Sequence, residues 1–478
     1  MRIHTIVPAL LLTLVMVRAL AQSAPDSPDH VSRFTGEQQV KDEAKRVLAS
    51  QFSLEPYRTY TLAELVNLAE EHNPETRLAW ENARAQLAAL GIARSELYPT
   101  LTVVVLSETE RSEALLGSQF YRQTIQSFGG ELDLNYTICD FGGRAGRIAA
   151  ARADLLAANF AFNDTHRKII YEVARSYYQL VNAVGQEEAA RASLTNAQEI
   201  QQAAEDRLKN GLATLPDVLE AQSSVAESQY ELQAALGAEK NSSGDLATVL
   251  GTRPTDRIQV QSIDQLVIPE SIDGSVDQAI DRALEQRPDL MQRVAEIRKA
   301  KASVKEARSA FYPVLSVAVS PTGQSLYGLQ QQLPWAHTAD LDGGLRLSLN
   351  WTLFDGGARK DNQARTQADL HAAEARARVT RDEIADEVWR SYSNLETSLG
   401  QRQAARALLT AANQSYAATL ESYDDGVRNF LDVTAAQSTL ARARSADVLA
   451  RTQVLSNLAD LAFETGELVQ SNGRRPKP

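Results

Sequence analysis

Side chains able to do chemistry are few in this sequence and stand far apart. Five histidines follow the N-terminal segment, namely His30, His72, His166, His337 and His371. Their spacing is not that of metal ligands, and Met291 alone does not indicate a copper pathway. The two Asp-containing glycine pairs lack the Lys-Ser/Thr of a phosphate-binding loop, and no nucleophile, base and oxyanion donor stand together. The residues therefore predict no enzyme, no metal and no cofactor.

Two glycine pairs instead follow strands and precede long helices. Residues 130–140 alternate between apolar and polar side chains, with Leu132, Leu134, Tyr136 and Ile138 on one face. Residues 344–354 repeat this pattern. The residues that end the two strands are Asp140, Gly142 and Gly143 in the first and Asp355, Gly356 and Gly357 in the second. We interpret both sets as joints at which a strand turns into a helix.

The whole chain reads as a tandem duplication. Pro74 matches Pro288 at a spacing of 214 residues, and Gly211 matches Gly426 at a spacing of 215 residues. The triplet Arg175-Ser-Tyr recurs at Arg390 with the same spacing. The predicted divisions are a signal peptide (1–21), an N-terminal arm (22–57), a first repeat (58–251), a connector (252–276), a second repeat (277–470) and a tail (471–478).

The bulk properties indicate an exported chain. Arg2, the apolar run from Ile6 to Val17 and the small residues before Gln22 form a secretory signal, and the run is too short to span a bilayer. A net charge of −12 argues against nucleic acid as a partner. Cys139 is the only cysteine. It ends a strand far from the cleavage site, so we expect a small apolar strand residue and no lipid anchor.

The predicted helices are too long for a compact domain. From Arg144 to about Lys209 the chain has no proline and is rich in alanine. Some 65 helical residues would extend for about 100 Å. The break at Asn210-Gly211 and the proline at Pro216 predict a turn and a second, returning helix. Such rods indicate stacked or coiled-coil helices.

Four strands are predicted, at about residues 99–109, 130–140, 313–323 and 344–354, with loops over 107–128 and 321–343. Each strand has the length that a tilted strand needs to cross a bilayer. Four strands cannot close a barrel alone, but three copies of the chain would give twelve. An aromatic belt is predicted at Tyr98, Tyr136, Phe141, Tyr312, Trp351 and Phe354. The fold class is thus mainly α with membrane β, and the sheet and helices together suggest a conduit.

The order strand, glycine-pair turn, long helix occurs twice over about residues 58–470. The turn reads Asp140-Phe-Gly-Gly in the first copy and Phe354-Asp-Gly-Gly in the second. This duplicated order resembles the TolC-type outer-membrane efflux proteins. The resemblance implies a homotrimer with a 12-stranded barrel in outer-membrane lipid and a periplasmic α-helical barrel. It also implies two protein partners, a periplasmic adaptor and an inner-membrane pump of the RND, ABC or MFS class, and a role in efflux or type I secretion.

Tip residues carry over from the same resemblance. The implied adaptor-docking positions are Gly211, Leu212, Ala213, Gly426 and Val427. The implied latch of the periplasmic gate consists of Tyr423, Arg428, Asp217 and Asp432. Pro216 stands where the family has a hydrogen-bonding Thr, and Ala435 where it has a second acidic layer. We therefore expect a weaker latch and one acidic ring, from Asp432, that favours cations.

The sequence is compatible with two functions. The first is a passive outer-membrane exit duct. The alternative is an exported periplasmic scaffold or adaptor with coiled-coil helices and a small soluble β domain. Only the duct needs four strands that each present one apolar face to lipid. For Asp217 and Asp432, helix capping is an equally good reading and is compatible with a gate role.

Overall fold

The computed structural model describes residues 37–47, 52, 54–55, 58–330 and 334–469. The predicted signal peptide, most of the N-terminal arm and the C-terminal tail lie outside the described residues. The chain forms two units, residues 1–53 and 54–478. In the first unit, helix α1 (Glu37–Val47) lies in the segment predicted as the N-terminal arm.

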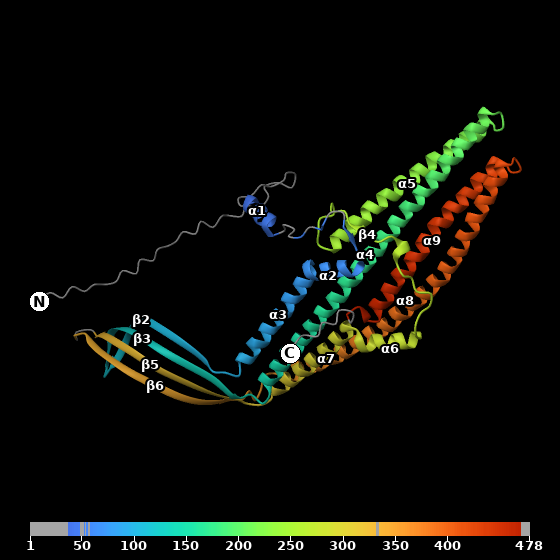
Figure 1. Cartoon of the computed structure of the whole chain (residues 1–478). Coiled ribbons are helices and arrows are strands. Elements are labelled where there is room, and N and C mark those ends of the chain that lie inside the picture. Colours follow the sequence, from blue (N-terminus) through green and yellow to red (C-terminus); the bar gives the residue numbers. More distant parts are fainter. Residues whose placement is uncertain (1–36, 48–51, 53, 56–57, 331–333, 470–478) are drawn as a thin grey trace. The chain divides into compact units, whose positions relative to one another are not determined.

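The second unit is built from two copies of one series of elements (Figure 1). The first copy consists of α2 (Leu62–His72), α3 (Pro74–Ser95), β2 (Thr100–Leu116), β3 (Gln119–Cys139), α4 (Gly143–Lys209) and α5 (Leu215–Val249). The second copy consists of α6 (Val276–Gln286), α7 (Pro288–Ser309), β5 (Val314–Gln330), β6 (Ala336–Asn350), α8 (Ala358–Asp424) and α9 (Phe430–Glu464). Corresponding helices have equal lengths: 11, 22, 67 and 35 residues in each copy.

Short elements lie between and after the copies. Strand β1 (Thr59–Tyr60) pairs in parallel with β4 (Gln259–Val260) of the predicted connector. The 3-10 helix η1 (Ile263–Gln265) follows in the connector, and η2 (Glu467–Val469) follows α9. The sequence alone did not indicate β1 or β4, because two residues are too few to show a period.

The helix boundaries follow local rules that the sequence displays. Thr61 and Glu64 form a reciprocal capping box at the start of α2. Asn73 ends α2 and caps α3, where its side chain accepts a hydrogen bond from the Glu75 backbone N–H. Pro74 then occupies the first turn of α3, where its missing N–H costs nothing.

The four long strands form one antiparallel sheet in the order β2-β3-β5-β6. The prediction of a mainly helical fold with four long strands is therefore confirmed. The strand limits, however, were wrong at one end. Most of the predicted loop 107–128 belongs to β2 and β3, and the predicted loop 321–343 includes the outer parts of β5 and β6.

The outer halves of the strands escaped prediction because their side chains do not alternate. Ser, Thr, Glu, Arg and Gln occupy both faces there, which is typical of a loop in a hydropathy reading. The backbone ladder nevertheless continues to a two-residue turn between Leu116 and Gln119. Gly117 has φ +62° in this turn, a conformation that suits glycine. A ladder of 17 residues extends for about 55 Å.

Helix α4 is the element on which the second unit is assembled. It contacts α2, α3, α5, α7 and α9, whereas α8 contacts α6, α7 and α9. Glycines allow two of these contacts to be close. A Cβ at Gly146 would lie 2.9 Å from the Glu306 backbone N of α7, and one at Gly185 would lie 2.7 Å from Val448 of α9. Among the described residues, no helix has the length and apolar character needed to cross a membrane.

We predict that Gly146→Ala destabilises the contact between α4 and α7 by at least about 1 kcal/mol, because the added methyl group meets backbone that cannot turn aside. The matched control is Gly237→Ala in α5, where nothing lies within 4 Å. That change should stabilise the helix by up to about 1 kcal/mol. The thermal midpoints of the purified variants should move in opposite directions, and a shift of equal sign would contradict this account of the contact.

Candidate functional site

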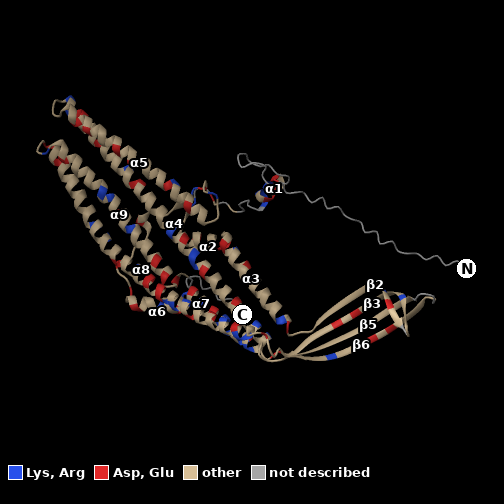
Figure 2. Cartoon of the chain, turned by 180° about the vertical axis from the view of Figure 1, so that it is seen from behind, with Lys and Arg blue, Asp and Glu red and all other residues tan. Residues whose placement is uncertain are grey.

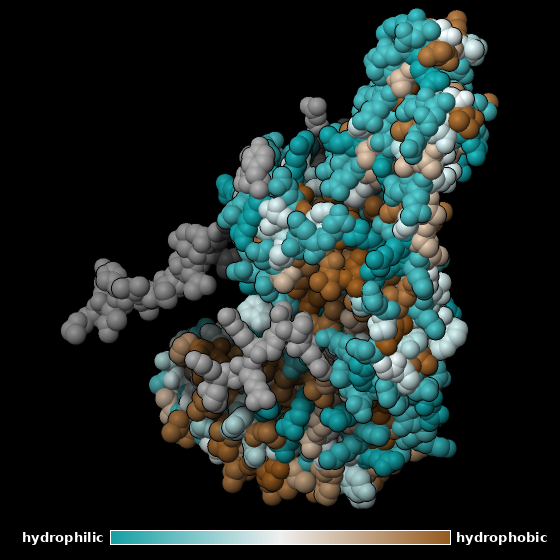
Figure 3. Space-filling model, turned by 45° about the vertical axis from the view of Figure 1, so that its right-hand side comes forward, coloured by the Kyte–Doolittle hydropathy of each residue, from teal (hydrophilic) through white to brown (hydrophobic). Residues whose placement is uncertain are grey.

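The sheet has one apolar face that runs without interruption across all four strands. The ladder places Val103 opposite Leu132 and Val317 opposite Leu347. The same face carries Leu101, Val105, Leu134, Tyr136, Leu315, Val319, Leu345 and Leu349. Many of these side chains are exposed, including Val103 at 69% and Leu345 at 76%. Figure 3 shows apolar residues gathered over the lower part of the unit and hydrophilic ones over the helical tips.

Ile138 departs from this pattern at the base of β3. The register shifts by one residue between Thr137 and Cys139, so that Cys139 pairs with Leu315. A bulge of this kind breaks the alternation, and the predicted place of Ile138 on the apolar face therefore does not follow from the ladder.

The opposite face of the sheet is polar and acidic. Glu131 and Asp342 both lie opposite Thr322, so the two carboxylates belong to one row of the ladder. Neighbouring rows of the same face carry Glu108, Glu110, Asp133 and Asp340. Arg346, opposite Ala318, is the one basic residue among the described ladder positions of this face. A surface of this kind favours cations in the water next to it.

The first predicted joint is held by Asp140. Its carboxylate accepts a hydrogen bond from the Arg144 backbone N–H and lies 3.7 Å from the Arg144 side chain. Gly142 has φ +104° before the first turn of α4. At Gly143 a Cβ would lie 2.8 Å from the Asp140 carboxylate and 2.9 Å from the Ser309 hydroxyl, so little space is left there for a side chain.

The second joint repeats this arrangement. The Asp355 carboxylate accepts hydrogen bonds from the backbone N–H groups of Gly357 and Arg359 and from Arg359 Nε. Desolvation opposes the charge, but the bonds from Arg359 lower the pKa of Asp355. Gly356 and Gly357 have φ +66° and +96°. Phe141, which corresponds to Gly356, has φ +50° and is the non-glycine residue with positive φ among the described residues.

Charged residues concentrate where the strands pass into the helices (Figure 2). A hollow of about 810 Å³ opens there, on the side that Asn135 and Thr137 face. Arg147 of α4 reaches across it to Glu96 at 2.6 Å and to Glu306 of α7 at 3.5 Å. The region where the strands pass into the helices is therefore polar and held by ion pairs, and it is not an apolar core.

The predicted belt aromatics lie at this level but differ in position. Tyr98 and Phe354 are exposed, and the ring of Phe141 stacks on Tyr312 at 5.4 Å. Tyr136 is half-buried and lies under the Arg144 guanidinium. Trp351 is not a strand residue, because β6 ends at Asn350. Its indole N–H donates to the Phe311 carbonyl oxygen. The prediction that this strand extends to residue 354 was therefore wrong.

The helical tips are two exposed turns. Gly211 and Gly426 have φ +71° and +77° and end α4 and α8. Leu212 and Val427 are 68% and 80% exposed, while Ala213 is half-buried. The exposed apolar residues continue onto the returning helices at Leu215, Leu219 and Leu431. The predicted docking positions therefore form a small apolar surface at each tip.

The predicted latch residues are only partly brought together. Asp217 accepts hydrogen bonds from the Thr214 backbone N–H and hydroxyl, so it completes the capping box of α5. Arg428 forms an ion pair with Asp432 of its own hairpin at 3.5 Å. Asn429, and not Asp432, caps α9. Among the described residues no hydrogen bond links Arg428 to Asp217.

Tyr423 is a core residue at the tips and not a free hydroxyl arm. It is 6% exposed and packs with Phe430, Val218 and Ile200, so that it joins the two hairpins. Burial raises the pKa of Tyr423, Arg207 opposes this rise, and the charge of Asp217 adds to it. The latch itself stays a prediction.

Arg207 is the tip residue that the sequence did not reveal. Its guanidinium carbon lies 4.4 Å from the centre of the Tyr423 ring, and its Nη1 donates to the Tyr423 carbonyl oxygen at 3.0 Å. The pair is separated by 216 residues. The only signal was that Arg207 is one of two basic residues, with Lys209, in the last turn of α4, where basic residues are common in any helix.

Comparison with known proteins gives a consistent family. A model of the family described as outer membrane efflux protein matches residues 65–252 and again residues 279–467. Protein CyaE of Bordetella pertussis is 26% identical over 425 residues, which are 87% of this chain and 86% of that protein. The pyoverdine export outer membrane protein OpmQ of Pseudomonas aeruginosa is 25% identical over 404 residues, with 82% and 81% covered.

The fold is also that of a solved outer membrane channel. The open state of the Neisseria gonorrhoeae MtrE channel superposes with a TM-score of 0.70 at 20% identity, covering 85% of this chain and 88% of that one. This likeness concerns the fold of one protomer.

We predict that Tyr423→Ala opens the contact between the hairpins at a cost of about 3 kcal/mol, because it leaves a cavity among buried residues. Tyr423→Phe keeps the ring and should cost less than about 1 kcal/mol. Hydrogen exchange of the two tips measures both. Tyr230→Ala is the matched control, since Tyr230 of α5 is 77% exposed. If Tyr423→Phe is as damaging as Tyr423→Ala, the hydroxyl and not the packing joins the hairpins.

Proposed function

The chain belongs to the outer membrane efflux protein family, and from that premise we propose that three copies form an exit duct through the outer membrane. Each copy contributes four strands to a 12-stranded barrel and its long helices to a periplasmic tube. Substrates delivered by an adaptor and an inner-membrane pump pass through it without further energy.

One observation carries this proposal, namely the two-faced sheet. Its apolar face spans all four strands and is exposed in the single chain. Among the described strands, β2 and β6 are each paired on one side only. Open edges are not tolerated in hydrocarbon, whereas pairing of β6 with β2 of the next copy removes them. The apolar face would then meet lipid and the acidic face would line the lumen.

The alternative, a soluble scaffold, gives no role to this face. A soluble sheet buries one side against a second layer. Among the described residues, no helix packs over the four-stranded sheet as a second layer. The relative named for pyoverdine export and the family described as outer membrane efflux protein also support the duct.

The tips would serve two purposes in the duct. Leu212, Val427 and the exposed leucines near them would dock the adaptor, while Asp432 would contribute a ring of three carboxylates at the constriction. The joint glycines and the aromatic residues around them would mark the periplasmic edge of the membrane. Export by a signal peptide without lipidation completes the proposal.

We predict that the purified protein forms cation-selective channels in planar bilayers. Replacing Glu131 with Gln and Asp342 with Asn together should lower the ratio of K⁺ to Cl⁻ permeability, because both carboxylates lie in one row of the polar face. The measurement is the reversal potential in a salt gradient.

Glu113→Gln is the matched control, because Glu113 lies on the opposite face of β2, in register with Arg122. It should leave the permeability ratio unchanged. A purified trimer without conductance, or a purified protein that stays monomeric and soluble without detergent, would overturn the duct.

We predict that a photo-reactive group on a cysteine at Ala213 crosslinks to a periplasmic adaptor in intact cells, since Ala213 lies beside the exposed apolar tip. The native thiol is removed first by Cys139→Ala. The same group at Ala234, an exposed residue midway along α5, is the control and should give no such adduct. Equal adducts at both positions would refute docking at the tips.

A further inference from the structure

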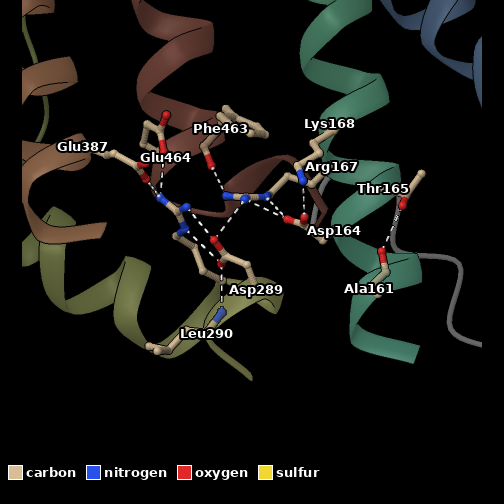
Figure 4. A network of polar contacts seen from close by, with 11 residues as sticks. Ala161, Asp164, Thr165, Arg167, Lys168, Asp289, Leu290, Glu387, Phe463 and Glu464 are labelled. Atoms are coloured by element: carbon tan, nitrogen blue, oxygen red, sulfur yellow. Dashed lines mark hydrogen bonds and ion pairs between the residues drawn. The ribbon is translucent and has the colours of Figure 1, made fainter. Parts of the chain in front are cut away.

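A cluster of charged side chains lies among the helices, far from both the sheet and the tips along the chain (Figure 4). We call it the mid-helix cluster. Its members are Asp164, Arg167, Lys168, Arg287, Asp289, Glu387 and Glu464. They come from α4, the junction of α6 and α7, α8 and α9. The cluster therefore ties the first repeat to every helix of the second.

Arg287 is the centre of the cluster. Its side chain is only 5% exposed. It holds Asp289 with two parallel hydrogen bonds, of 3.1 and 2.7 Å. Its Nη1 also donates to Glu387 and to Glu464, each at 2.7 Å. Two carboxylates from different helices thus converge on one nitrogen.

Arg167 connects this centre to α4. It is 1% exposed and donates to Asp164 at 2.8 Å and to the Phe463 carbonyl oxygen at 3.0 Å. It also lies 3.7 Å from Asp289. Lys168 pairs with the second oxygen of Asp164. The cluster therefore holds three cations against four carboxylates, and one bound proton would balance it.

Glu464 is the carboxylate that the fold makes hardest to ionise. It is the last residue of α9, where the helix dipole disfavours negative charge. Burial raises the pKa of Glu464 to about 7, and the charge of Glu387 adds to the rise against the opposing charges of Arg287 and Arg167. The Glu387 side chain is 45% exposed, so solvent has access to the pair.

Other titratable groups around Glu464 do not neutralise it. From α4, α6, α9 and η2 these are Tyr171, Arg175, Arg282, Asp460 and Glu467. Asp460 hydrogen-bonds Tyr171, and burial raises the pKa of Asp460. Arg282 pairs with Glu467. The charge of Arg175 acts on Tyr171 and Asp460, where it opposes the rise of both pKa values.

We propose that Glu464 holds one proton beside Glu387, and that the two side chains form a proton-sensitive clamp on Arg287 at the mid-helix cluster. With the proton bound, both side chains rest on Arg287 and hold α8 and α9 to the start of α7. Without it, the surplus negative charge separates the carboxylates and loosens the end of α9. The clamp itself rests on the geometry of one chain, whereas its effect on the duct rests on the proposed function.

The direction of the pH effect follows from the pKa values. The carboxyl of Glu464 has an ordinary pKa of 4.5 and is raised to about 7 in the folded chain. The folded state binds the proton more tightly, so the clamp is strongest at low pH and weakens as the pH rises toward and through 7. Opening of the segment should become about tenfold more favourable between pH 6 and pH 8.

The test is hydrogen exchange of the last turns of α9 in the purified full-length protein, corrected for the intrinsic effect of pH on exchange. The wild type should show the tenfold change in opening. Glu464→Gln, which imitates the protonated group, should show less than a twofold change. Glu467→Gln, three residues further on, is the control and should behave as the wild type does.

Glu387→Gln removes the repelling partner and should also reduce the pH dependence, which keeps the test decisive if Glu464→Gln does not fold. A tenfold change that persists in either folded glutamine variant overturns the clamp. Conductance of the same samples separates the two proposals. A protein that shows the clamp but forms no channel would refute the duct alone, and a channel without the pH-dependent opening would refute the clamp alone.

Discussion

An open sheet edge is the constraint on which the rest of this structure depends. Strands β2 and β6 each expose a row of backbone N–H and C=O groups on one side, and hydrocarbon offers these groups no partner. The apolar face of the sheet nevertheless favours contact with hydrocarbon. The proposed assembly would meet both demands, because further copies of the chain would supply the missing strand neighbours.

The duplication makes such an assembly geometrically simple. Helices α4 and α8 have 67 residues each and both begin at an Asp-anchored turn with left-handed glycine. Two rods of equal length that start at the same level reach the same level at their far ends. Each copy then brings two equivalent hairpins to the tip, and adjacent hairpins can pack alike within one chain and between chains. Unequal rods would leave one tip without a partner at its own height.

The parts of the fold that the sequence predicted depend on residues that lie close together in the chain. The alternation at Leu132 and Leu134, the capping box at Thr61 and the glycines of the joints all act over a few residues. The outer half of β2 lacked such a signal because water solvates polar side chains on both faces of a strand. The contact of Arg287 with Glu464 spans 177 residues, and no local period can report a pair that only the tertiary fold creates.

The tips and the mid-helix cluster hold the two repeats together by different forces. Each tip turn satisfies its own polar groups, since Thr214 binds Asp217 and Arg428 pairs with Asp432. What joins the hairpins there is the packing of Tyr423 and the Arg207 guanidinium on its ring. Apolar packing and an arginine do not titrate near neutral pH, whereas burial raises the pKa of Glu464 in the cluster to about 7. Under the proposed clamp, a rise in pH therefore loosens the end of α9 while the tips stay joined, so that pH would act on the helices and not on the proposed gate.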